Sequence, residues 1–103
     1  MASVRTELLS TLDDTLALLG SCGERHWAKW LAGDRAAIAG GRVPAIAHLL
    51  SAFGGMGSFN DLYLSPANGH ALTEADVPTV NAKLDSLRSR LYDLAYSQRE
   101  EAI

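Results

Sequence analysis

The chain has 103 residues and a formal net charge of −3, and 48% of its residues are hydrophobic. This length and apolar content suit one domain with its own core, and they exclude disordered, collagen-like and low-complexity classes. No apolar run reaches the roughly 18 residues of a membrane span, and the N-terminus lacks the pattern of a secretion signal. We therefore expect a cytoplasmic protein that does not associate with membranes.

The acidic excess lies in the second half of the chain. Residues 1–52 carry five basic and five acidic side chains, whereas residues 53–103 carry four basic and seven acidic ones. An acidic surface repels phosphate backbones and attracts basic proteins. The charge pattern therefore argues against nucleic acid as a partner and favours a basic protein, although ordinary solubility charge would give the same balance.

Apolar residues recur at helical spacing in the first forty positions. Residues 3–19 predict an amphipathic helix that ends at Gly20, because glycine tolerates left-handed backbone dihedrals. Residues 24–38 predict a second helix that Gly40 and Gly41 end. We expect Gly33 and Asp34 to divide this helix in two, with Asp34 capping the second piece. Inside it, Trp27 and Trp30 either pack in the core or lie exposed as interface anchors.

Two further helices are predicted downstream. Pro44 suits the first turn of the third, which carries an apolar face and closes at Gly54 and Gly55. The last helix starts near Pro78, with Thr73 and Asp76 forming a shortened capping box. Its heptad seam consists of Val77, Val80, Leu84, Leu87, Leu91 and Leu94. This seam packs either within the chain or against a second copy. The sequence therefore predicts an all-α fold, a four-helix bundle forming a single domain over residues 1–103.

A long segment, residues 54–72, precedes the last helix. It is rich in glycine but also apolar, which is unusual for a connector, so we expect an ordered loop with a short extended piece over residues 59–64. The glycines at its start, Gly54, Gly55 and Gly57, indicate positive dihedrals or close backbone approach. They lack the lysine of a phosphate-binding loop and close a helix instead of opening one, which argues against nucleotide binding.

Polar residues of this loop are candidates for binding a partner. They are Ser58, Asn60, Asp61 and Tyr63. The alternative is that the first three bond to the loop's own backbone. Asp13 and Asp14 add a second acidic patch, since adjacent helical residues point too far apart to act as a catalytic carboxylate pair.

No constellation predicts catalysis, a metal or a cofactor. His26, His48 and His70 lie in separate segments without metal-ligand spacing, and His48 is expected to form a hydrogen bond at the edge of the core. Cys22 is the only cysteine, which excludes an intramolecular disulfide and is typical of a small buried residue. We therefore predict that the protein is not an enzyme. A small-molecule or catalytic site using Cys22 or the histidines is the weaker reading.

The run Gly54-Gly-Met-Gly-Ser-Phe-Asn-Asp-Leu62, between a helix with tryptophans and one rich in leucine, resembles a small bacterial family of uncharacterised domains. The resemblance extends over residues 8–94 and implies no catalytic residues. Such families are similar in size and acidity to immunity proteins that neutralise polymorphic or secreted toxins.

Together these observations predict a protein-binding inhibitor. It would be an immunity protein whose acidic loop covers the active site of a cognate toxin with a basic surface, with Asp61 meeting lysine or arginine. The alternative is a structural or regulatory homo-oligomer assembled through the heptad seam of the last helix.

Overall fold

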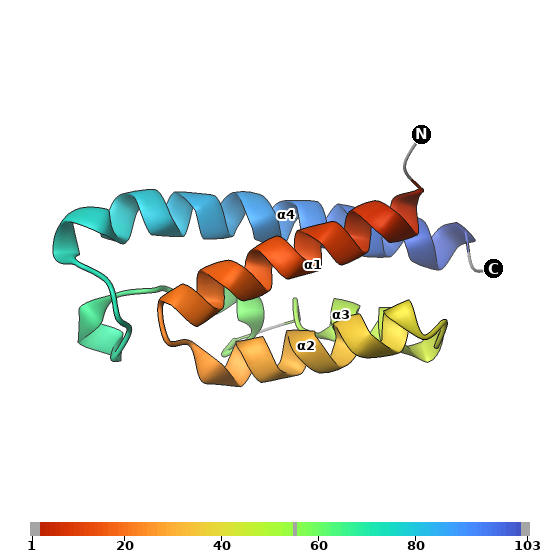
Figure 1. Cartoon of the computed structure of the whole chain (residues 1–103), viewed down its shortest axis with the longest axis horizontal. Coiled ribbons are helices and arrows are strands. Elements are labelled where there is room, and N and C mark those ends of the chain that lie inside the picture. Colours follow the sequence, from red (N-terminus) through yellow and green to blue (C-terminus); the bar gives the residue numbers. More distant parts are fainter. Residues whose placement is uncertain (1–2, 55, 102–103) are drawn as a thin grey trace.

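The computed structural model describes residues 3–54 and 56–101. Over these residues the regular structure is entirely helical, so the predicted all-α class is confirmed (Figure 1). The four α-helices are α1 (Val4–Ser21), α2 (Arg25–Ala39), α3 (Pro44–Ser51) and α4 (Val77–Glu101). Three short 3-10 turns follow α3: η1 (Phe59–Asp61), η2 (Pro66–Asn68) and η3 (Glu74–Asp76). Within the described part of the chain no helix is long and apolar enough to cross a membrane.

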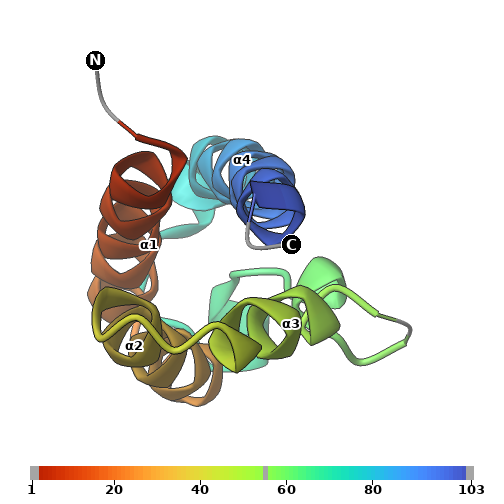
Figure 2. The same cartoon turned by 90° about the vertical axis from the view of Figure 1, so that its right-hand side faces the viewer.

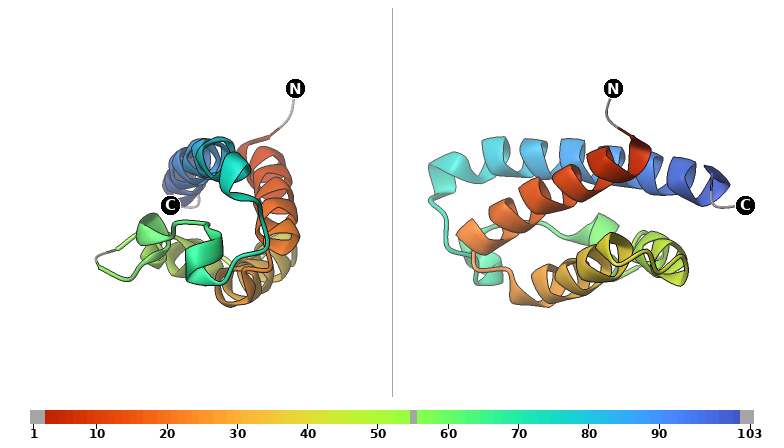
Figure 3. Two further views of the ribbon diagram at one scale, coloured as in Figure 1. Left: turned by 90° about the vertical axis from the view of Figure 1, so that its left-hand side faces the viewer. Right: turned by 45° about the vertical axis from the view of Figure 1, so that its right-hand side comes forward.

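The helices surround a core that runs along the long axis. Helix α4 packs mainly against α1 and runs antiparallel to it, and α2 returns beside α1 (Figure 1). Seen end-on, α1 and α3 lie on opposite sides, with α4 closing the top (Figure 2). The segment from η1 to η3 crosses the end of the molecule beside the turn between α1 and α2 (Figure 3). There the Ala71 N–H donates to the Cys22 carbonyl over 2.8 Å.

The core is built mostly from leucine. All four helices and the loop contribute side chains that are fully buried: Leu8, Leu12, Leu19, Leu31, Leu49, Phe59, Leu64, Leu84 and Leu91. The heptad seam of α4 is part of this core. Val77, Leu84 and Leu91 are buried, and the other seam residues are partly buried against the same cluster. The seam is therefore used within the chain.

The first two helices differ from the prediction at their junction. Helix α1 continues through Gly20 to Ser21, and the residue with a positive φ is Gly23, at 70°. The Glu24 carboxylate then accepts the N–H of Trp27 over 2.7 Å and caps α2. Helix α1 can pass through Gly20 because a glycine inside a helix costs only about 1 kcal/mol. The turn to α2 therefore comes three residues later, at Gly23.

The predicted division of α2 at Gly33 and Asp34 is wrong. The helix is continuous from Arg25 to Ala39. Asp34 does not cap a second piece because its carboxylate is buried and bonds to His48 of α3. The end of α2 is held by Arg5 of α1, whose Nη2 donates to the carbonyls of Ile38 and Ala39 over 3.0 and 2.7 Å. The Ile38 carbonyl also accepts the Gly41 N–H over 3.0 Å, whereas the bond to Ala39 satisfies a carbonyl that the helix end leaves unpaired.

Helices α3 and α4 begin where the sequence places them. Pro44 opens α3, but the helix ends at Ser51, three residues before Gly54. The Thr73 hydroxyl accepts the N–H of Asp76 over 3.3 Å, and Pro78 lies in the first turn of α4. Gly55, the other predicted closing residue of α3, lies outside the described residues.

The extended piece predicted over residues 59–64 is wrong in its first half. Residues 59–61 form the 3-10 turn η1 because the Ser58 hydroxyl accepts the N–H of Asn60, over 3.3 Å, and starts a turn. Only the backbone after Asp61 is extended. Phe59 and Leu64 at the two ends of this stretch are fully buried, so the loop packs on the helices as part of the core.

Candidate protein-binding surface

Arg88 of α4 holds the loop after α3 in place. Its Nη1 donates to the carbonyls of Phe59, Asn60 and Leu62 over 2.7, 3.1 and 2.9 Å. Its Nη2 pairs with the carboxylate of Asp85. Arginine suits this position because its planar fork of five donors meets several acceptors at once. A buried cation on a regular helix thus determines the path of an irregular segment.

Asn81, which lies one turn from the start of α4, holds the next part of the loop. Its Oδ1 accepts the N–H of Leu64, and its Nδ2 donates to the carbonyls of Leu64 and Val77, each over 2.8 Å. Asn81 is itself buried. The side chain therefore pairs both backbone groups of Leu64, which would otherwise be buried without partners.

Most of the predicted loop residues bond to the loop's own backbone. Asp61 Oδ2 accepts the N–H of Gly57 over 2.7 Å, and Asn60 Nδ2 donates to the Phe53 carbonyl over 3.0 Å. Ser58 is buried and caps η1. Asn60 and Asp61 remain exposed, so they are available to a partner as well. Gly57 has a φ of 75°, as predicted, but the prediction is wrong for Gly54, which has neither a positive φ nor a close backbone approach.

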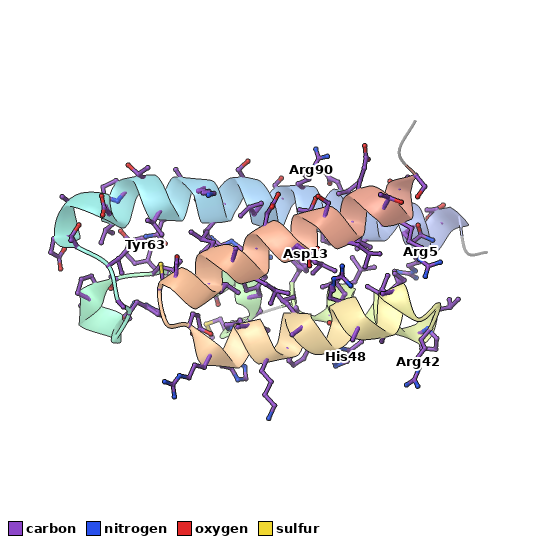
Figure 4. All side chains as sticks on the ribbon, viewed as in Figure 1. Arg5, Asp13, Arg42, His48, Tyr63 and Arg90 are labelled. Atoms are coloured by element: carbon purple, nitrogen blue, oxygen red, sulfur yellow. The ribbon has the colours of Figure 1, made fainter. Side chains whose placement is uncertain are left out.

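The structure does not bring all the predicted partner-binding residues together. Tyr63 is 53% exposed and lies near η2, at the end of the molecule away from the chain termini (Figure 4). Asp13 lies on α1, where its carboxylate pairs with Arg35 over 2.9 Å. Asp14 borders a separate hollow between α1 and α4 that includes Lys83. The part of the loop that follows α3 directly and carries Asn60 and Asp61 lies on the opposite side from α1 (Figure 2), so these residues do not form one surface.

A groove that was not predicted lies between the loop and α4. Its volume is about 370 Å³. The lining side chains, which define the aromatic–acidic groove, are Phe53, Asn60, Asp85, Arg88, Ser89, Tyr92 and Asp93. The rings of Phe53 and Tyr92 meet edge to face at 5.6 Å, and Tyr96 stacks on Tyr92 at 6.2 Å. Tyr92 and Tyr96 are 44% and 47% exposed, so this edge of the groove presents aromatic surface to solvent.

A signal for this groove is present in the sequence. Asp85, Ser89, Tyr92 and Tyr96 follow one another at spacings of four, three and four, which places them on one helical face. That face is distinct from the leucine seam, and two tyrosines on it are more aromatic surface than a solvated helix needs. No sequence pattern indicates that the loop forms the other side of the groove, because the position of the loop depends on its hydrogen bonds to Arg88.

A second cluster, the Trp30–Asp34–His48 cluster, joins α2 to α3. His48 Nδ1 lies 2.6 Å from Asp34 Oδ1, and the imidazole stacks on the Trp30 ring with centroids 4.5 Å apart. The predicted hydrogen bond of His48 is thus present, although over half of its side chain is exposed. Among the residues that the structure describes, Asp34 Oδ2 and Trp30 Nε1 are buried without a hydrogen-bond partner.

Burial raises the pKa of Asp34 above its ordinary value, because the charged carboxylate loses its hydration. His48 offsets part of this effect through its hydrogen bond and its charge, and the nearby indole N–H of Trp30 adds a smaller contribution that lowers the pKa. The cluster therefore keeps a carboxylate in an environment that disfavours its charge.

The remaining histidine and cysteine candidates are tied into the fold. His70 Nδ1 accepts the N–H of Ser65 over 3.1 Å, and its Nε2 lies 3.5 Å from Glu24. Cys22 is buried, and its carbonyl accepts the Ala71 N–H. Within residues 3–54 and 56–101, no three His, Cys, Asp or Glu side chains are grouped as metal ligands.

The fold and these surfaces define a small all-α domain with an ordered loop beside its last helix. The sequence model of one family, described as a domain of unknown function (DUF6966), matches residues 20–73. The match covers just over half of the chain, and the chain belongs to this family. It includes the Trp30–Asp34–His48 cluster and the loop but ends before α4. No curated protein and no solved structure matches the chain.

Proposed function

We propose that the chain is a protein-binding inhibitor, specifically a bacterial immunity protein that covers the active site of a cognate toxin. The observation that carries the proposal is an ordered loop, held by Arg88 and Asn81, beside a groove with exposed aromatic rings. A loop already fixed in one conformation loses little entropy when it binds.

The chemistry of this surface suits a basic protein partner. Asp61, Asp85 and Asp93 are exposed along the loop and the adjoining face of α4. Met56, in the same loop as Asp61, is 99% exposed. Exposed aromatic residues are typical anchors of protein interfaces, and acidic side chains around them speed encounter with a basic partner. The proposed interface therefore has both an apolar anchor and a charge that selects its partner.

Inhibition by this surface needs no chemical step. A toxin that acts on an anionic substrate carries lysine and arginine at its active site, and an acidic face that covers these residues excludes the substrate. We expect the inhibitor to act in the cytoplasm and without a cofactor.

The homo-oligomer alternative has less support than the inhibitor. It depends on the heptad seam of α4, but Leu84 and Leu91 are fully buried in the core of their own chain. An oligomer would have to use another face, and the acidic groove of one copy would repel that of a second. We therefore favour a partner of opposite charge.

The proposal is tested by co-expression with the toxin encoded beside this gene. We expect growth to be restored and the two proteins to co-elute on gel filtration. Tyr92→Ala and Asp61→Ala should each weaken the complex about tenfold, while unfolding of Asp61→Ala shifts by less than about 1 kcal/mol because only one exposed bond is lost. Asp14→Asn, on the far side of the molecule, serves as the control. Failure to restore growth and to form a complex would refute the proposal.

A further inference from the structure

The aromatic–acidic groove has more hydrogen-bond acceptors than donors. The Asp93 carboxylate forms no ion pair within the described part of the chain, and Asp85 has a second oxygen beyond the one that meets Arg88. Asn60 uses its Nδ2 on the Phe53 carbonyl, which leaves its Oδ1 as an acceptor. An occupant with several N–H groups would therefore pair with these acceptors.

The cation already in the groove does not meet this need. Arg88 Nη1 is committed to three loop carbonyls and Nη2 to Asp85, so the guanidinium cannot turn toward Asp93 without releasing the loop. With one arginine and two aspartates, the lining keeps a formal charge of −1. An occupant with a positive charge is favoured.

The aromatic rings that line the groove favour one kind of cation over another. Tyr92 is partly exposed along the groove, and its ring contacts Phe53 edge to face. A guanidinium is planar, carries five N–H donors and stacks on aromatic rings, whereas an ammonium is a compact and strongly hydrated point charge. Surplus acceptors beside an aromatic face match the guanidinium better.

We propose that the groove holds an arginine side chain of the partner protein, with its guanidinium between the Tyr92 ring and the Asp93 carboxylate. The inference rests on the proposed function, because it identifies what the toxin inserts into this surface. It also makes the groove the site of specificity. A partner with lysine at the same position loses the stack on Tyr92 and part of the hydrogen bonding.

The test uses the full chain and two capped tripeptides, acetyl-Gly-Arg-Gly-amide and its lysine counterpart, in an NMR titration at low salt. We expect chemical-shift changes at the backbone amides of Ser89, Tyr92 and Asp93. The lysine peptide should bind at least about threefold more weakly. Asp93→Asn should weaken the arginine peptide about fivefold, and Asp14→Asn should leave it unchanged. Tyr92→Phe should retain binding and Tyr92→Ala should lose it, with the spectrum of each variant confirming its fold.

Two outcomes overturn this inference: equal binding of the two peptides, or no shift at the groove residues in a folded protein at millimolar arginine peptide. A toxin complex that Asp93→Asn and Tyr92→Ala leave unchanged also overturns it while the proposed function stands. Binding of the arginine peptide at the groove without any toxin complex would refute the proposed function, and it would show that the groove recognises arginine on a different partner.

Discussion

Two charged side chains, Arg88 and Asp34, are buried among the residues that the structure describes, and their surroundings differ sharply. Arg88 on α4 meets three backbone carbonyls and the Asp85 carboxylate. Asp34 on α2 meets only His48, and its second oxygen has no hydrogen-bond partner among the described residues. A buried charge stabilises a fold only when its hydrogen bonds are complete, and otherwise its desolvation costs free energy. Arg88 therefore stabilises the loop that it contacts, whereas the buried Asp34 carboxylate lowers the stability of the contact between α2 and α3.

The difference follows from what surrounds each side chain. Arg88 faces an irregular loop, whose carbonyls need partners because no regular structure pairs them. Asp34 lies between two helices whose backbone groups already bond within each helix, so only side chains can reach it. The groove that we propose as a binding site lies beside the well-satisfied charge, in the part of the molecule with a fixed backbone.

The comparison predicts the largest loss for replacement of Arg88. Arg88→Met removes the bonds that the Phe59, Asn60 and Leu62 carbonyls accept from the buried guanidinium. Of these three carbonyls, Phe59 keeps another bond, from the Leu62 N–H over 3.2 Å. We expect the free energy of unfolding to fall by about 3 kcal/mol. Denaturation by guanidinium chloride measures the free energy of unfolding of the variant and of the wild type. Arg90→Met is the matched control, since Arg90 is exposed and makes one long bond of 3.3 Å to Thr11. Equal losses for the two variants would contradict the role given to Arg88.

We expect a smaller loss of stability on replacement of Asn81, a neutral side chain that also pairs backbone groups of the loop. Asn81→Leu fills a similar volume but leaves the N–H and the carbonyl of Leu64 without partners, at a cost of about 2 kcal/mol. The exposed Asn68, whose Nδ2 donates to the Tyr63 carbonyl over 3.0 Å, gives the control Asn68→Ala, with a loss below about 1 kcal/mol. Thermal unfolding of the Asn81→Leu and Asn68→Ala variants compares their losses of stability. An Asn81→Leu variant as stable as the wild type would show that the loop does not depend on this residue.

Backbone conformation in the loop gives a third measurement. Gly57 has a φ of 75° with open space around it, so Gly57→Ala should cost about 1 kcal/mol through dihedral strain alone. Gly54 is not among the residues with positive φ, and an added Cβ would lie 3.7 Å from the Ser51 carbonyl, an ordinary contact. Gly54→Ala should therefore be neutral or slightly stabilising. If both variants unfold alike, the conformation of Gly57 is not what holds the loop.

The smallest effect is expected at the poorly satisfied charge. Asp34→Asn removes a buried carboxylate but keeps an oxygen for His48 Nδ1, and we expect a change below about 1 kcal/mol at pH 7. The difference from wild type should depend on pH. Because folding raises the pKa of Asp34, the folded state holds this proton more tightly than the unfolded chain does.

The stability that protonated Asp34 contributes is therefore fully present below the ordinary aspartate pKa and is lost as pH rises through the raised folded value. Relative to Asp34→Asn, the wild type should gain stability between pH 7 and pH 4, which denaturation at several pH values measures. Taking the difference removes the opposite trend of the surface carboxylates. A wild type that loses stability relative to the variant on acidification would reverse the assignment.

Several features of the fold were predictable because they depend on neighbours in the sequence. Pro44 and Thr73 mark helix starts through local geometry, and the leucine spacing of α4 identifies its buried face. The prediction failed at Asp34, which looks like a cap when only its neighbours Gly33 and Arg35 are considered. Its partner His48 lies fourteen residues away on another helix. A local pattern contains no information on such a contact.

The candidate site shows the same division. The exposed Asn60 and Asp61 and the positive φ of Gly57 followed from the composition of the loop. Tyr92 and Asp93 were missed, since their importance depends on the loop that Arg88 draws alongside them. Asp13 and Asp14 were grouped with the loop on charge alone, and the helix that carries them lies on the other side of the molecule.

By itself, the sequence determined the helical class, the approximate extents of the four helices and the acidic character of the second half, since these depend on periodicity, caps and composition. Tertiary structure decided which face became the groove, which charges were satisfied and which residues met. The physical reason is that hydrogen bonds from Arg88 and Asn81 join segments up to 29 residues apart, and such pairings form only once the core has packed.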